Sequence, residues 1–142
     1  MRLVLDTSVV VAGLRSPDGA SRLWLEAALR GRFSLLLSVP LLLEYEAVLS
    51  RKDNLAASNL EKSEVGALLD AFCKLGEPVE LQYLWRPMLR DPGDEMVLET
   101  AALGRADALL TFNIRDFAGS ERWGISVEEP GPAWHHRKGN LK

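Results

Sequence analysis

Apolar residues fall into two kinds of stretch along this chain. Short continuous runs, bounded by small or turn-forming residues, are typical of buried strands in a parallel sheet. Such runs occur at residues 2–6, 33–39, 108–112 and 125–127, with a shorter candidate strand within 78–84.

Between these runs, apolar residues recur at the three- and four-residue spacing of amphipathic helices. The predicted helices span residues 9–14, 20–29, 40–51, 60–75 and 95–103, and 53–59 is either a loop or a short helix. Because strands and helices alternate, the sequence predicts an α/β fold, namely a three-layer α/β/α sandwich around a central parallel sheet. Residues 1–130 are expected to form one domain, and residues 131–142 a flexible C-terminal tail.

Acidic and polar side chains stand where the predicted strands end. Asp6 ends the first strand, and Thr111, Asn113 and Asp116 stand at or just beyond the end of the strand at 108–112. In open parallel sheets, ligands bind outside the carboxyl ends of the strands. We therefore expect these side chains to meet at one edge of the sheet and to form a site there.

Each of these acids also has an ordinary structural explanation. Asp6 can cap the helix that follows it, and Asn and Asp are common in turns. Asp91, Asp94 and Glu95 open a predicted helix, where acids are favoured, although three acids within five residues exceed what one cap needs.

Two further acids lie on the predicted helix at 40–51. Glu44 and Glu46 flank an apolar face centred on Leu41, Tyr45 and Leu49, one on each side. At about 100° per residue, helical periodicity does not choose between the two glutamates.

A cluster of carboxylates cannot stay fully ionised without cations among them. Carboxylate and amide oxygens are hard ligands that suit Mg²⁺ or Mn²⁺. A site of this kind that is open to water suits phosphodiester hydrolysis by metal-activated water.

Composition narrows the classes of function. The 142 residues carry a formal net charge of −3, which does not favour bulk electrostatic binding to nucleic acid. The single Cys73 lies in a helical stretch and is predicted to be a buried, inert thiol that forms no intrachain disulfide. No apolar run reaches the roughly 18 residues of a membrane span. Asp6 interrupts the N-terminal apolar run, which lacks the charged region and cleavage site of a signal peptide, so the cytosol is the expected compartment.

Taken together, these residues resemble the PIN-domain family of ribonucleases, in particular the VapC-like toxin components of toxin–antitoxin systems. The resemblance covers residues 2–129. It is carried by LVLDTSVVVAGL at 3–14, LLLSVPLLLEYEAVLS at 35–50, RDPGDEMVLETAALGRADALLTFNIRDF at 90–117, and ISVEEP at 125–130.

The resemblance implies roles for individual residues. The catalytic acids that bind the metal would be Asp6, Glu44, Asp94 and Asp116, with Asn113 and Asp91 as further metal ligands. Substrate would be positioned by Ser8, Thr111, Arg90 and Arg115. Asn113 departs from the pattern, because many relatives carry Asp at that position.

The resemblance also implies a Rossmann-like α/β/α sandwich and an endoribonuclease that depends on Mg²⁺ or Mn²⁺. Its partners would be an RNA substrate, a cognate antitoxin and a second copy in a homodimer, with no membrane. Basic residues would guide RNA to the acidic site, and further candidates are Arg15, Arg86 and the pair at 51–52.

Three other functions compete with the PIN-domain ribonuclease. A phosphoaspartate phosphatase needs a second acid two residues after the first, where this chain has Ser8, and a receiver domain needs a lysine at a strand end, where this chain has none predicted. The third is a PIN fold that has lost catalysis and serves as an RNA- or protein-binding module, which Asn113 keeps open.

Overall fold

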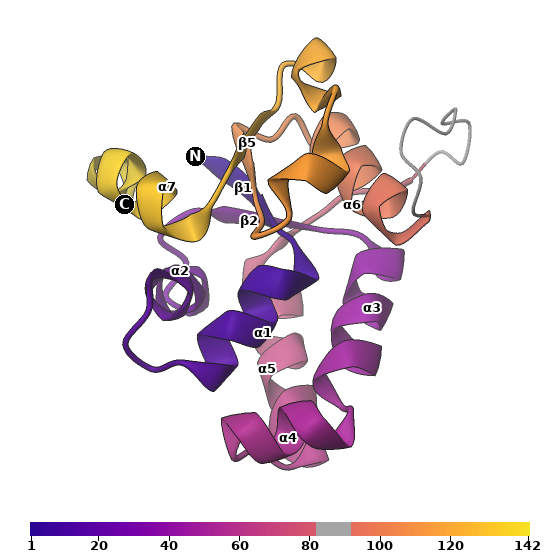
Figure 1. Ribbon diagram of the computed structural model, residues 1–142, viewed down its shortest axis with the longest axis vertical. Helices are drawn as coiled ribbons and strands as arrows, with labels where there is room; N and C mark the ends of the chain where they lie inside the picture. The colour runs from indigo at the N-terminus through magenta and orange to yellow at the C-terminus, as the bar shows by residue number, and fades with distance from the viewer. Residues whose placement is uncertain (82–91) are drawn as a thin grey trace.

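A five-stranded parallel sheet forms the centre of the computed structural model, which describes residues 1–81 and 92–142 (Figure 1). The strands lie in the order β3-β2-β1-β4-β5, and all neighbouring pairs are parallel. Their bounds are β1 Arg2–Leu5, β2 Ser34–Leu37, β3 Glu77–Pro78, β4 Ala108–Leu110 and β5 Ser126–Glu128.

This strand order fixes where a site can form. From β1 the chain moves outward through β2 to β3, and later segments add β4 and β5 on the other side of β1. The direction of winding therefore reverses between β1 and β4, and the carboxyl ends of these two strands flank the crevice where doubly wound sheets bind ligands.

Helices cover the sheet on both faces, as the sequence predicts for an α/β/α sandwich. Helices α1 and α5 pack against β1 and β2, and α6 packs against β1, β2 and β4, on the other side of the sheet in Figure 1. The helices are α1 Thr7–Arg15, α2 Ala20–Leu29, α3 Val39–Leu49, α4 Lys52–Ser58, α5 Lys62–Leu75, α6 Pro92–Leu103 and α7 Pro130–Arg137. Short 3-10 turns follow at η1 Ile114–Phe117, η2 Ser120–Trp123 and η3 Lys138–Asn140. None of the helices in the described ranges is long and apolar enough to cross a membrane.

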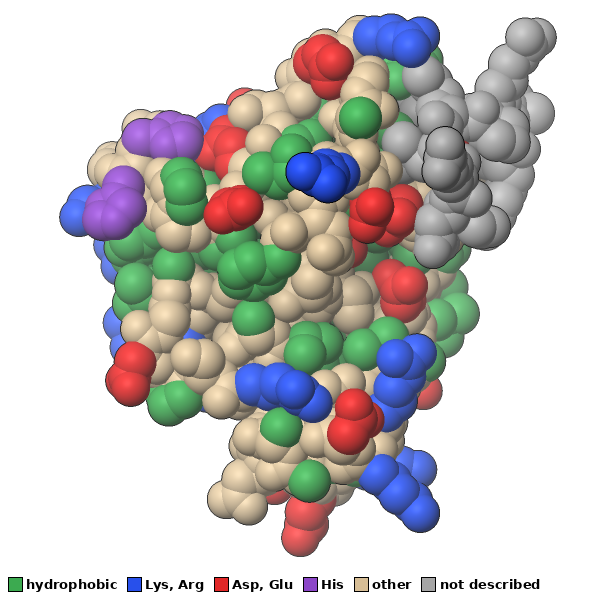
Figure 2. Space-filling model, viewed as in Figure 1, with side chains coloured by type: hydrophobic (Ala, Val, Ile, Leu, Met, Phe, Trp, Pro, Cys, Tyr) green, Lys and Arg blue, Asp and Glu red, His purple; other side chains and the backbone are tan. Residues whose placement is uncertain are grey.

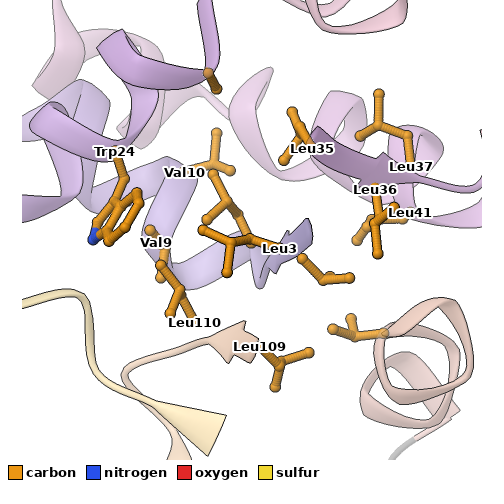
Figure 3. Packing of buried hydrophobic residues seen from close by; sticks show 14 of the residues in the cluster. Leu3, Val9, Val10, Trp24, Leu35, Leu36, Leu37, Leu41, Leu109 and Leu110 are labelled. Carbon is orange, nitrogen blue, oxygen red and sulfur yellow. The ribbon is translucent and has the colours of Figure 1, made fainter. Parts of the chain in front are cut away.

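The core lies between the apolar strands and the buried faces of the helices. Leu3 of β1 and Leu36 of β2 are fully buried, and Figure 3 shows Val9 and Val10 of α1 beside Leu3, with Trp24 of α2 next to them. Continuous apolar runs form these strands because both faces of a parallel sheet are covered.

Two predicted features differ from the structure. Cys73 is exposed rather than buried, because the apolar stripe of α5 runs through Val65, Leu69 and Phe72 and leaves the next position facing solvent. Helix α1 begins at Thr7, two residues before the predicted start.

The C-terminal segment is the third difference. Where the sequence predicts a tail from residue 131, the structure has helix α7, packed against α2. Trp134 meets Trp24 edge-to-face with ring centroids 5.0 Å apart, and the Trp24 indole N–H donates a 3.0 Å hydrogen bond to the Pro130 carbonyl. Trp24 is fully buried by these contacts, so it is a core residue.

Candidate active site at the carboxyl edge of the sheet

Asp6 stands at the junction of β1 and α1. Its backbone N–H donates a 2.9 Å hydrogen bond to the Leu110 carbonyl of β4, which carries the strand pairing one residue past β1. Asp6 occupies the N-cap position of α1, yet its side chain makes no capping hydrogen bond. Helix capping therefore does not explain this carboxylate, which is 6% exposed.

The Asp6 carboxylate is held instead by two hydroxyls from different segments. Ser8 donates a 2.8 Å hydrogen bond to Asp6 Oδ2, and Thr111 at the end of β4 donates one of 2.7 Å to the same oxygen. These two hydrogen bonds fix the orientation of the Asp6 carboxylate.

The same two hydroxyls also fix the loop after β4. The Ser8 oxygen accepts a 3.2 Å hydrogen bond from the Phe112 N–H, and the Thr111 oxygen accepts one of 2.9 Å from the Asn113 N–H. Ser8 and Thr111, which the family resemblance assigns to substrate positioning, thus contact the Asp6 carboxylate and this loop. Their contact with a substrate stays a prediction.

Glu44 of α3 is hydrogen-bonded to the residue that directly follows Asp6. Thr7, the residue after Asp6, donates a 2.7 Å hydrogen bond to Glu44 Oε2. Glu46 is exposed and lines a different hollow, which it shares with Lys62 of α5. The structure therefore favours Glu44 where helical periodicity left both glutamates open.

Tyr45 links α3 to the end of β1. Its buried hydroxyl donates a hydrogen bond to the Leu5 carbonyl, one residue before Asp6. Burial raises the pKa of Tyr45 well above its usual value, and the charges of Asp6 and Glu44 raise it further. The phenol therefore stays protonated and neutral.

The two remaining predicted acids come from α6 and η1. Asp94 is half-buried in the first turn of α6, a helix that packs against both β1 and η1. Asp116 in η1 is exposed and, with Asn113 and Arg115, lines a hollow beyond β4. Among residues 1–81 and 92–142, no three His, Cys, Asp or Glu side chains form a group that could hold a metal ion, so the structure does not bring Asp94 and Asp116 together with Asp6 into such a group. Their role as metal ligands stays a prediction.

Several predicted residues lie outside the part of the chain that the structure describes. These are Asp91, Arg90 and Arg86. Of the other basic candidates, Arg15 is exposed and forms a 3.7 Å ion pair with Asp53.

Sequence reasoning missed Thr7 and Tyr45 as parts of this site. A signal for Thr7 was present, because it directly follows Asp6 at the start of a helix and must lie near the same edge of the sheet. The hydroxyl of Tyr45 gave no such signal, since the helical pattern assigned its side chain to the apolar face.

A doubly wound parallel sheet with helices on both faces and Asp6 at its switch point makes this protein an α/β/α sandwich with a candidate site at the carboxyl edge of the sheet. The sequence matches the PIN domain family over residues 2–115, and the chain belongs to that family.

One solved structure has the same fold. It is described as the crystal structure of VapBC2 from Rickettsia felis bound to a DNA fragment from their promoter. The match has a TM-score of 0.58 and 18% identity, and covers 91% of this chain and 98% of that chain. No curated protein sequence matches this one.

Proposed function

We propose that this protein is a metal-dependent endoribonuclease that hydrolyses RNA phosphodiester bonds and acts as the toxin of a toxin–antitoxin pair. The observation that supports the proposal is the oriented Asp6 carboxylate at the switch point of the sheet, together with the hydrogen bond from the next residue, Thr7, to Glu44. Membership of the PIN domain family supports the nuclease class.

The residues present fit a hard divalent cation. Mg²⁺ is usually held by one or two protein carboxylates and keeps several of its waters. Asp6 and Glu44 supply two carboxylates from separate elements, and each receives hydroxyl hydrogen bonds that orient it. Asp94 and Asp116, with Asn113 and Asp91, would be the further ligands, and Mg²⁺ or Mn²⁺ the cofactor.

Different residues of the chain would bind the cation, orient its ligands and attract the RNA. Asp6 and Glu44 would hold the cation, and the cation when bound would supply a water of lowered pKa and offset charge on the scissile phosphate. Ser8, Thr111 and Thr7 would keep the carboxylates in the binding geometry. Arg115, exposed near the site, would attract the RNA backbone toward an otherwise acidic pocket.

The experiment is RNA cleavage by the purified chain with added Mg²⁺ or Mn²⁺, followed on a gel. We expect cleavage by the wild type, loss of cleavage on chelation with EDTA, and no cleavage by Asp6→Asn. Asp18→Asn, which changes an exposed acid in the loop between α1 and α2, should cleave like the wild type. Equal cleavage by wild type and Asp6→Asn would refute the proposal.

The toxin role rests on the fold shared with the VapBC2 structure, which is described as a complex bound to promoter DNA. A cognate antitoxin that binds this chain should suppress the cleavage. The other candidate function is a catalytically inactive binding module, favoured by the amide of Asn113 where many relatives have an acid. Tight RNA binding by the wild type without cleavage at any divalent metal would favour that candidate.

A further inference from the structure

A hollow of about 510 Å³ lies at the loop that follows β4. It is lined by Phe112, Asn113, Ile114, Arg115, Asp116 and Glu129. Over the segments that follow β4 in Figure 1, apolar, acidic and basic side chains lie side by side on the surface (Figure 2).

Phe112 is exposed at the rim of this hollow although its backbone is fixed. Its ring is 48% exposed, and Ile114 beside it is 41% exposed. The Phe112 N–H is bound to Ser8 and the following N–H to Thr111, the two residues whose hydroxyls hold Asp6. The backbone that carries this aromatic ring is therefore held by two hydrogen bonds to the residues that orient the Asp6 carboxylate.

The charges of the hollow distinguish between the parts of a nucleotide. Glu129 would repel a phosphate, but a carboxylate accepts hydrogen bonds from the exocyclic amino groups of bases. Arg115 is the only cation among the described lining residues and suits a flanking phosphate or the face of a second base. An exposed aromatic ring in a hollow that also offers a carboxylate acceptor thus matches a nucleobase better than the sugar–phosphate backbone.

We propose that this hollow is a subsite for an unpaired nucleobase that stacks on Phe112 next to the scissile phosphate. The inference rests on the proposed ribonuclease function and adds a residue that determines which RNA binds. A base inside a duplex already has stacked neighbours on both faces, so the subsite selects single-stranded RNA. Stacking on an aromatic side chain tolerates many sequences because every base has a π-face.

The test measures binding separately from cleavage. The full chain carries Glu44→Gln, which leaves the Phe112 loop and its hydrogen bonds untouched and is expected to keep the RNA intact. The probes are single-stranded RNAs of about 8 nucleotides, within the usual site size, each with one 2-aminopurine. Fluorescence anisotropy gives affinity, and quenching of 2-aminopurine reports stacking.

Phe112→Ala is expected to weaken binding by roughly 5- to 150-fold, the range for loss of one base–aromatic stack, and to abolish the quenching. Phe112→Tyr should keep both affinity and quenching, whereas Phe112→Leu should lose the quenching although it keeps apolar volume. The matched control is Trp123→Leu, which removes an aromatic ring of similar exposure, 47%, that does not line the hollow. It should leave affinity and quenching unchanged.

Three results would overturn the inference. The first is equal RNA affinity for Phe112→Ala and its parent, and the second is equal affinity of the parent for single-stranded RNA and for a duplex of the same sequence. The third is a Phe112→Ala variant that binds RNA normally but no longer captures an antitoxin protein. Phe112-dependent binding together with a wild type that never cleaves RNA would refute the nuclease proposal and keep the base subsite. Metal-dependent cleavage by the wild type, together with RNA binding that is unchanged in Phe112→Ala, would refute the base subsite and keep the nuclease proposal.

Discussion

The Thr111 hydroxyl donates a 2.7 Å hydrogen bond to Asp6 Oδ2 and so joins two residues 105 positions apart in the chain. Thr111 is fully buried, and its oxygen also accepts the Asn113 N–H. One side chain thus orients the carboxylate at the end of β1 and anchors the loop at the end of β4.

Thr111→Val removes both hydrogen bonds while keeping the shape of the side chain. We expect the free energy of unfolding to fall by about 1–3 kcal/mol, because a loop N–H and a carboxylate lose their partner. Metal-dependent RNA cleavage should fall roughly 10- to 100-fold, as is usual when a residue that orients a metal ligand is lost. Urea unfolding and single-turnover cleavage measure the two effects.

Thr111→Ser is the matched control, since it keeps the hydroxyl and removes only a methyl group. It should retain most of the cleavage rate. If Thr111→Val cleaves RNA as fast as Thr111→Ser, the hydroxyl does not position Asp6 for catalysis.

The carboxylate of Glu128 at the end of β5 predicts a dependence of stability on pH. It accepts hydrogen bonds from Arg137 Nη2 at 2.6 Å and from Ser126 at 2.7 Å, and lies 3.0 Å from His136 Nε2. Burial alone raises the pKa of Glu128, but the hydrogen bonds from Arg137 and Ser126 and the charges of Arg137 and His136 outweigh it. The pKa is therefore lowered from its usual 4.5.

A lowered pKa means that this carboxylate stabilises the folded state above pH 4.5 and that the contribution is lost as the pH falls through the folded-state pKa. Urea unfolding of wild type and Glu128→Gln should give a stability difference that shrinks as the pH is lowered below 4.5. Glu121→Gln, at an exposed glutamate, serves as the control. A difference between wild type and Glu128→Gln that is constant with pH would contradict this assignment.

Two glycines of the α5 region should respond in opposite directions to substitution by alanine. A Cβ on Gly66, inside α5, would meet nothing within 4 Å, so Gly66→Ala should stabilise the protein by about 0.5–1 kcal/mol through helix propensity. A Cβ on Gly76 would lie 2.7 Å from the Phe72 carbonyl oxygen and 2.5 Å from Leu37 Cδ1. Gly76→Ala should therefore cost about 1–3 kcal/mol.

Thermal unfolding of the two variants measures the contrast between these positions. If Gly76→Ala stabilises the protein, α5 packs less closely against β2 than the structure shows.

The pattern of apolar runs was enough to predict the sheet and the place of Asp6. Runs such as Leu35–Leu37, short and bounded by serines, favour a strand, because a strand covered on both faces is apolar throughout. The position of Asp6 follows from where the first run ends, and the α/β/α fold follows from the alternation of runs with helical stretches.

Other features depend on contacts between distant segments, which periodicity does not encode. Glu44 and Glu46 are equivalent on a helical wheel, and only Thr7, brought close by folding, distinguishes them. The segment at 130–137 begins with two prolines and a glycine, which predict a tail. It becomes helical because Trp134 packs on Trp24 of α2.

Mn²⁺ titration by calorimetry, without RNA, measures whether Asp6 and Glu44 together bind a divalent cation. We expect saturable binding by the wild type and by Glu46→Gln, which removes the neighbouring acid outside the site. Asp6→Asn and Glu44→Gln should each weaken the binding, and the double variant should abolish it. If the double variant binds Mn²⁺ as tightly as the wild type, the cation lies elsewhere and the proposed active site is wrong.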